Sequence, residues 1–170
     1  MEKHFSGSVN KFEEGLWSYY ILVPEKVYQA FKSEKIKRIV VTINAFTPPI
    51  HAGFMPIGDG SYFIKLNKDL IKEYQLKLGD KVHVVIEEDT SKYGMPITTE
   101  MEEVLHNDPE GSKLFHTLTP GKIRQLIFLV NKVKSSEARI EKSIIILEFL
   151  KRNTGKLDWK MLHENLKSGL

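Results

Sequence analysis

Residues 87–97, Glu-Glu-Asp-Thr-Ser-Lys-Tyr-Gly-Met-Pro-Ile, divide the chain into two parts with different hydrophobic periods. Before this stretch apolar and polar residues alternate as they do in strands, and after it the sequence is typical of capped helices. Because each part has to bury its own apolar face, the sequence predicts two small modules. We expect a β-rich domain over residues 1–90, a linker over 91–97 and a helical domain over 98–170.

The N-terminal part contains about six short strand-like segments. The strongest is residues 36–46, which is rich in β-branched side chains and is closed by Pro48-Pro49. Short helical stretches are expected after Pro24 and Asn67, since proline suits the first helical position and asparagine caps a helix. Short strands with tight turns are typical of a small closed or half-closed β-barrel, so the predicted fold class is α+β, with a small β-barrel followed by an all-helical module.

Capping residues mark the helix starts of the C-terminal part. Helices are expected to begin near Glu100, Pro109, Pro120 and Ser136, and a short docking helix should include Trp159, Leu162 and Leu166. Residues 140–150 are apolar around most of a helix circumference. This helix is therefore expected to be central in the bundle, or to meet the barrel or a second copy of the chain.

The composition excludes several classes of function. The chain of 170 residues has no cysteine, which excludes disulfide frameworks, thiolate zinc sites and cysteine nucleophiles. Its N-terminus lacks an apolar core of signal-peptide length, and the longest later apolar run, residues 144–147, is too short to span a bilayer. We therefore expect a cytoplasmic protein without a membrane partner.

Histidines are the first candidates for chemistry. The chain has six of them: His4, His51, His83, His106, His116 and His163. None has the spacing of a metal site or of a catalytic relay, so the sequence predicts no catalytic residue, no cofactor and no metal. Structural or surface roles are the favoured interpretation, and His51, in a loop between Pro48-Pro49 and Gly53, is the one position where a functional role is considered.

A pocket inside the barrel is the first candidate site. Its predicted lining residues are Trp17, Tyr19, Thr42, Asn44 and His51. If these side chains point inward, they give an apolar wall with a few hydrogen-bonding groups, which suits a small ligand. The favoured alternative is that Trp17 and Tyr19 belong to the core and have their polar tips satisfied there.

A basic strip on the helical part is the second candidate site. It consists of Arg124, Phe128, Lys132, Lys134, Arg139 and Lys142, the first three at steps of four residues. Cations beside an exposed aromatic ring could bind nucleic acid, following its backbone and stacking a base, or a protein partner. A net charge of only +3 argues against a dedicated nucleic-acid binder, and such an aromatic often packs under its neighbours' aliphatic stems.

Short signatures in both parts resemble two bacterial domains. Those of the first part are residues 17–24 followed by a helix, His51-Ala52-Gly53-Phe54, and Leu78-Gly79-Asp80-Lys81-Val82. With them, residues 5–88 resemble a small β-barrel domain of unknown function that is usually N-terminal. Residues 98–118, 119–124 and 139–142 are similar to the YdeI/OmpD-associated or bacteriocin-protection family. The resemblance implies this order of domains and an association with stress or bacteriocin resistance, without an established activity.

Two functional hypotheses follow. The first is a non-enzymatic protein whose barrel binds a small ligand or a protein partner, while the helical domain mediates association, homo-oligomers included. The alternative is a nucleic-acid-associated regulator that acts through Arg124, Phe128 and Lys132. An enzyme ranks third, since the sequence supplies neither an activated nucleophile nor a matched acid and base.

Overall fold

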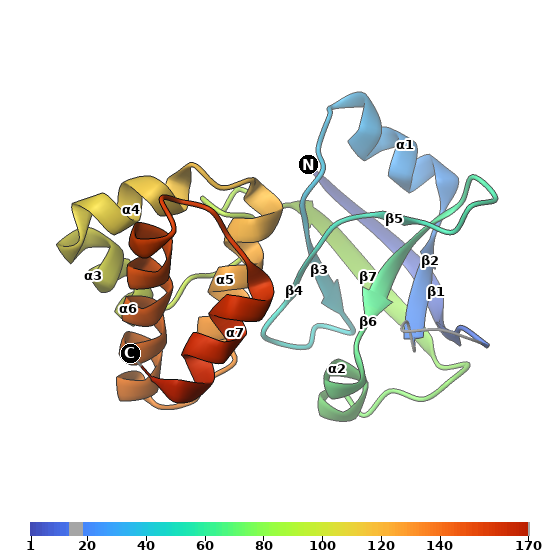
Figure 1. Cartoon of the computed structure of the whole chain (residues 1–170). Coiled ribbons are helices and arrows are strands. Elements are labelled where there is room, and N and C mark those ends of the chain that lie inside the picture. Colours follow the sequence, from blue (N-terminus) through green and yellow to red (C-terminus); the bar gives the residue numbers. More distant parts are fainter. Residues whose placement is uncertain (14–18, 170) are drawn as a thin grey trace. The chain divides into compact units, whose positions relative to one another are not determined.

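The computed structural model describes residues 1–13 and 19–169, and it shows an α+β protein (Figure 1). The chain divides into two compact units, Met1–Thr90 and Ser91–Leu170, which we call the β unit and the helical unit. Each unit has its own hydrophobic core. The α+β fold class is therefore confirmed.

The β unit is a curled antiparallel sheet of seven strands with two short helices (Figure 1). Its strands are β1 (Glu2–Lys11), β2 (Tyr19–Val23), β3 (Ile39–Ile43), β4 (Ile50–Ala52), β5 (Met55–Pro56), β6 (Tyr62–Leu66) and β7 (Lys81–Glu88), and its helices are α1 (Glu25–Ser33) and α2 (Lys68–Glu73). Their order is β4-β3-β7-β1-β2-β6-β5. The half-closed barrel expected from the sequence is thus present, with one more strand than about six.

Alternation along the strands separates a core face from an outer face of this sheet. On β3, Ile39, Val41 and Ile43 are fully buried, whereas Val40 and Thr42 between them are only half-buried. On β7 the same alternation buries Val82, Val84 and Ile86. Helix α1 adds the buried side chains of Val27 and Phe31 to this core. The polar residues of β1, β3 and β7 that alternate with the core residues consequently lie on the outer face.

The helical unit contains α3 (Thr99–Asn107), α4 (Pro109–His116), α5 (Pro120–Asn131), α6 (Ser136–Arg152) and α7 (Trp159–Ser168). The N-cap of α3 is Thr98, whose hydroxyl accepts from the N–H of Met101, so this helix begins one residue before the expected Glu100. Helix α5 begins at Pro120 as expected, and its N-cap Thr119 makes no side-chain capping bond. Proline at the first position already favours a helix start there, because its fixed φ suits that position.

Helix α6 is the centre of the helical unit. It contacts each of α3, α4, α5 and α7, and it buries residues on most sides, including Ile146, Leu147 and Leu150. The wide apolar surface of residues 140–150 is therefore largely covered within this unit, although Ile140 and Ile144 stay 40% and 39% exposed.

Helices α4 and α6 pack closely against each other near Gly111. Asp108 caps α4 by accepting from the N–H of Gly111 at 2.9 Å, and its other carboxylate oxygen lies 2.9 Å from Nζ of Lys151 on α6. The hydrogen bond from Gly111 and the ion pair with Lys151 lower the pKa of Asp108, and partial burial opposes them. A side chain on Gly111 would meet both Asp108 and Leu147. Glycine is needed here for the packing of two helices.

Candidate functional site

The predicted pocket residues do not share one face of the β sheet. Tyr19 packs against the core of the β unit, whereas Thr42 lies on the outer face of β3. His51 is the cross-strand partner of Val40, so it shares that outer face. Asn44 follows β3 with a φ of 48°, and its Oδ1 accepts from the backbone N–H of His83 at 2.8 Å. Trp17 lies outside the described residues.

The sequence of β3 is sufficient to predict on which face of the sheet Thr42 lies. Ile39, Val41 and Ile43 form a continuous apolar face, so strict alternation puts Thr42 on the opposite side. No comparable signal separates Tyr19 from Ile21, which lies on the same face of β2 and is fully buried.

His51 has a carboxylate partner that the sequence did not reveal. Its Nδ1 lies 2.8 Å from Oδ2 of Asp89, 38 residues away, and the Asp89 side chain is 0% exposed. Strands β4 and β7 both flank β3, which brings the two residues together. Since a carboxylate accepts only, Nδ1 of His51 donates to Asp89, and in a neutral ring the lone pair is then on Nε2. The pair can orient His51 as a hydrogen-bond acceptor at the outer face.

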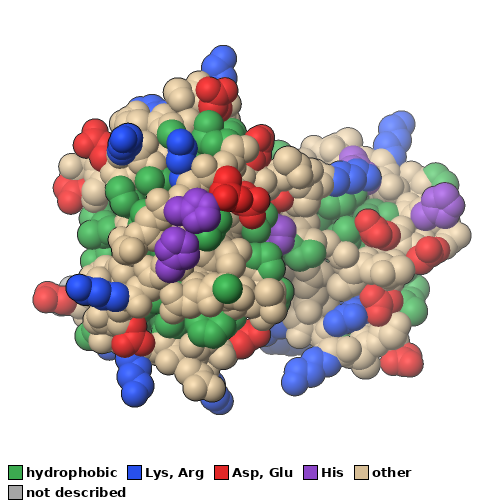
Figure 2. All heavy atoms as spheres, turned by 180° about the vertical axis from the view of Figure 1, so that it is seen from behind, with side chains coloured by type: hydrophobic (Ala, Val, Ile, Leu, Met, Phe, Trp, Pro, Cys, Tyr) green, Lys and Arg blue, Asp and Glu red, His purple; other side chains and the backbone are tan. Residues whose placement is uncertain are grey.

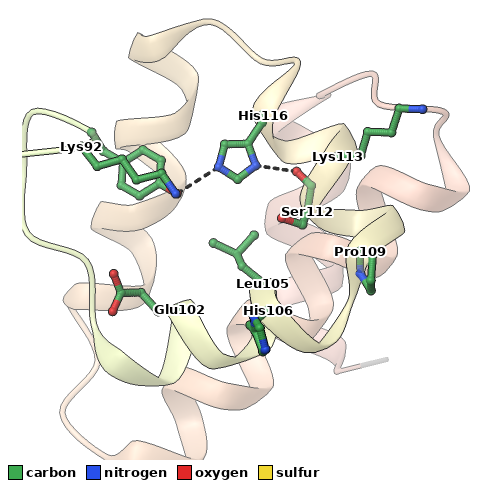
Figure 3. A pocket seen from close by; sticks show the side chains of 9 residues that line it. Lys92, Glu102, Leu105, His106, Pro109, Ser112, Lys113 and His116 are labelled. Atoms are coloured by element: carbon green, nitrogen blue, oxygen red, sulfur yellow. Dashed lines mark hydrogen bonds between the residues drawn. The ribbon is translucent and has the colours of Figure 1, made fainter.

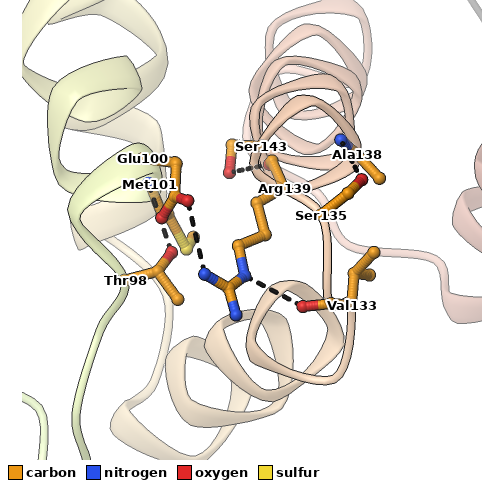
Figure 4. Close-up of polar contacts among 8 residues, drawn as sticks. All are labelled: Thr98, Glu100, Met101, Val133, Ser135, Ala138, Arg139 and Ser143. Carbon is orange, nitrogen blue, oxygen red and sulfur yellow. Dashed lines mark hydrogen bonds and ion pairs between the residues drawn. The ribbon is translucent and has the colours of Figure 1, made fainter.

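Arg139 of the basic strip has a structural role. Its Nε donates to the carbonyl of Val133 at 2.9 Å, and its Nη1 lies 3.3 Å from Oε1 of Glu100 (Figure 4). The pKa of Glu100 is lowered, chiefly by its own backbone N–H and further by Ser136 and Arg139. Arg139 thus ties the first turn of α6 to α3 and to the end of the preceding segment.

The other residues of the strip differ in exposure. Arg124 is half-buried and its Nη1 donates to the carbonyl of Tyr93 at 3.5 Å, while Lys142 is half-buried as well. Phe128 is 54% exposed, and Lys132 and Lys134 are exposed. The residues of the strip that are exposed to solvent are therefore Phe128, Lys132 and Lys134.

A groove of about 570 Å³ lies in the helical unit between α3, α4 and the segment before α3 (Figure 3). Its lining residues are Lys92, Tyr93, Glu102, Leu105, His106, Pro109, Ser112, Lys113 and His116. Leu105 supplies an apolar surface, and most of the remaining side chains are polar or charged. None of these residues was singled out as a site by the sequence, because the three segments meet only in the folded unit.

Tyr93 and His116 form a hydrogen-bonded pair in this groove. The Tyr93 hydroxyl lies 3.0 Å from Nε2 of His116, and Nδ1 of His116 lies 2.7 Å from the carbonyl oxygen of Ser112 (Figure 3). A carbonyl can only accept, so Nδ1 donates, and Nε2 of a neutral His116 accepts a hydrogen bond from the Tyr93 hydroxyl. Both ring nitrogens are held by the protein, and the ring is fixed in one orientation.

Charged groups surround this pair. Nζ of Lys92 lies 5.1 Å from the centre of the Tyr93 ring, over its face. Glu102 and His106 line the groove from α3, whereas Lys113 extends away from His116 (Figure 3). When His116 is protonated, its Nε2–H donates to the Tyr93 oxygen, and the Tyr93 hydroxyl is then able to donate to another acceptor. The groove can thus present a hydroxyl donor beside an ammonium group.

Neither a metal cluster nor a membrane helix is found in the described part of the chain. Within residues 1–13 and 19–169, no group of three or more His, Asp or Glu side chains is arranged to hold a metal ion. Over the same residues, every helix is too short or too polar to cross a bilayer.

Comparison with known families finds a match in the N-terminal part of the chain. Residues 5–86 match a family described as "Domain of unknown function (DUF1905)". This match lies within the β unit and confirms the expected resemblance of residues 5–88 to an N-terminal domain of unknown function. A comparison with curated proteins finds no match. The similarity of residues 98–170 to the YdeI/OmpD-associated family stays a prediction.

Proposed function

We propose that this chain, which carries a domain of unknown function at residues 5–86, is a binding protein whose helical unit takes a small anionic ligand in the groove of Tyr93 and His116. The observation that carries the proposal is the hydrogen-bonded chain from Tyr93 through His116 to the Ser112 carbonyl. An exposed imidazole rarely keeps a single orientation, because ordering it costs conformational entropy. A pair that is already ordered binds a ligand without that cost.

The charge of the groove favours a carboxylate or phosphate group. Lys92 supplies a cation beside Tyr93, and a protonated His116 supplies a second. In that state the Tyr93 hydroxyl donates to the ligand, which makes a charge-assisted hydrogen bond. Glu102 on α3 carries the opposite charge, so a ligand with an anionic group near Tyr93 and a positive group near α3 fits best. The groove volume is in the range of small-molecule sites.

Titration of the full-length protein with inorganic phosphate and with short-chain carboxylates tests this proposal. NMR signals of Tyr93 and His116 should shift when either anion is added. Tyr93→Phe removes one hydrogen bond to a charged ligand, which should weaken binding about tenfold. His116→Ala should weaken binding further.

His163→Ala is the matched control, because His163 is an exposed histidine of α7 outside the groove. Its binding should equal that of the wild-type protein. If neither anion shifts the signals of Tyr93 and His116, or if Tyr93→Phe binds as tightly as the wild type, the groove is not an anion site.

Nucleic-acid binding is the second candidate function, and the exposure of Phe128 favours it. A ring that is 54% exposed next to Lys132 could stack a base while the lysine contacts a phosphate. Arg124 and Arg139 contribute less, since both donate to backbone carbonyls of the helical unit.

Fluorescence anisotropy with single-stranded DNA at two salt concentrations checks this second function. Phe128→Ala should weaken binding, and Lys132→Ala should lower the slope of log affinity against log salt by about one. Lys167→Ala, at an exposed position of α7, serves as the control. Absence of binding at low salt would exclude the regulator hypothesis.

A role in stress or bacteriocin protection is the broadest form of the proposal. It rests on the resemblance of residues 98–118 and 139–142 to the YdeI/OmpD-associated family that the sequence predicts. Binding of a ligand in the groove of Tyr93 and His116 would then be the chemical signal to which the protein responds.

A further inference from the structure

Two histidines from distant parts of the sequence meet on the outer face of the β unit. Strands β1 and β7 are antiparallel neighbours in which His4 is opposite Val85, so His83, two residues before Val85, is its diagonal neighbour on the same face. Nδ1 of His4 lies 3.3 Å from Nε2 of His83, and the ring centres are 5.5 Å apart. Figure 2 shows two histidine side chains side by side on this unit, next to acidic side chains.

Glu2 sets the proton position on His4. Oε1 of Glu2 lies 2.5 Å from Nε2 of His4, and a carboxylate can only accept, so Nε2 carries the proton. The lone pair of a neutral His4 is then on Nδ1, the nitrogen that faces His83. A ligating histidine that donates its other N–H to a carboxylate is the usual arrangement behind protein-bound transition metals.

We propose that His4 and His83 form a binding site for a divalent transition metal ion such as Zn²⁺, Ni²⁺ or Cu²⁺. Two ligands of one tetrahedral ion with metal–nitrogen distances near 2.05 Å are about 3.3 Å apart, which is the separation of these two nitrogens. A neutral His83 has only to carry its proton on Nδ1 to present the Nε2 lone pair. Both ligands come from neighbouring strands in the middle of the sheet, which fixes their spacing.

The surroundings favour a cation with open coordination positions. Glu2 is the cross-strand partner of Glu87, so two carboxylates are adjacent on these two strands. The side chain of His4 is 52% exposed, and the ion would have room for water or for donor atoms of a bound molecule. This is a two-ligand site, and it is consistent with the lack of any group of three ligands in the described residues. It lies in the β unit and is independent of the groove proposed above.

Titration of the chelator-treated full-length protein with Zn²⁺ and with Cu²⁺ tests the site. Calorimetry should give one ion per chain. Cu²⁺ should bind more tightly than Zn²⁺, because sites with nitrogen ligands generally have a higher affinity for Cu²⁺. His4→Ala and His83→Ala should each lower the affinity at least tenfold. Glu2→Gln should lower it by about 10- to 100-fold, because the carboxylate orients His4 and makes it more basic.

His163→Ala is the control, since His163 is an exposed histidine of α7 outside the groove, and this variant should bind both ions like the wild-type protein. All four variants are at exposed positions, and an unchanged circular dichroism spectrum would confirm that they are folded. Wild-type affinity in His4→Ala or His83→Ala would overturn the proposal. So would a first equivalent of Zn²⁺ that shifts the NMR signals of other histidines and leaves those of His4 and His83 unchanged.

Discussion

Replacing Phe115 by alanine is expected to lower the free energy of unfolding of the helical unit by about 3–5 kcal/mol. Phe115 lies on α4, is 0% exposed, and belongs to the core formed with α6. The substitution loses the transfer free energy of a buried ring and leaves a cavity that the surrounding helices fill only in part. Urea unfolding followed by circular dichroism measures the change.

The same substitution should also weaken anion binding. The ring of Phe115 makes edge contacts with Tyr93 and with His116, at centre distances of 6.2 Å and 5.3 Å. Phe128→Ala is the matched control, because it removes the same ring from a position that is 54% exposed, and its effect on stability should be within about 0.5 kcal/mol. Equal losses in the two variants would contradict the packing of α4 described above.

Gly111→Ala is expected to destabilise the helical unit by about 1–3 kcal/mol, the cost of overpacking a core contact. An added Cβ would lie 2.8 Å from Cβ of Leu147 and 2.6 Å from Oδ2 of Asp108. The Leu147 atom is fixed to the backbone of α6 and cannot rotate away, so the two helices would have to separate. Any movement of Asp108 would cost its capping bond and its ion pair with Lys151.

Gly121→Ala provides the control for this second prediction. Gly121 lies in the first turn of α5, and a Cβ there meets nothing within 4 Å. Alanine is the better helix former, so this variant should be as stable as the wild-type protein or up to about 1 kcal/mol more stable. Thermal and urea unfolding of both variants compare the two glycines directly. A Gly111→Ala protein as stable as the Gly121→Ala protein would mean that α4 and α6 are not in close contact.

Acid should remove part of the stability that Asp108 contributes. Its pKa is lowered in the folded unit, so its contribution is present above the ordinary carboxyl pKa near 3.8 and is lost as the pH falls through the lower folded value. The direction follows from the N–H of Gly111 and the ammonium of Lys151, both of which stabilise the charged form.

Local patterns in the sequence were sufficient to predict most helices and strands and the exposure of many of their side chains. Alternation predicted the strand at β3, and proline and capping residues predicted the helices at Pro109 and Pro120. Phe128, at steps of four residues from Arg124 and Lys132, was expected to be an exposed ring, and it is 54% exposed. These properties depend on residues within a few positions of one another. They can be predicted from the sequence because helices and strands have different periods.

The sites depend on contacts over long sequence distances. His4 and His83 are 79 residues apart, His51 and Asp89 are 38 apart, and Tyr93 and His116 are 23 apart. Each pair meets because two strands or a loop and a helix are placed side by side by the burial of other, apolar residues. No spacing rule for metal ligands or relays covers such distances, so the histidines carried no local signal.

The sequence by itself determined an α+β chain with a change of period at residues 87–97, the place of most helices and strands, and an N-terminal domain of unknown function. Tertiary structure alone decided that His51 lies on the outer face beside Asp89, and that His116 is held between Tyr93 and Ser112. The physical reason is that periodicity records which residues share a face, whereas strand order and helix packing, which minimise exposed apolar surface over the whole unit, decide which faces and side chains meet.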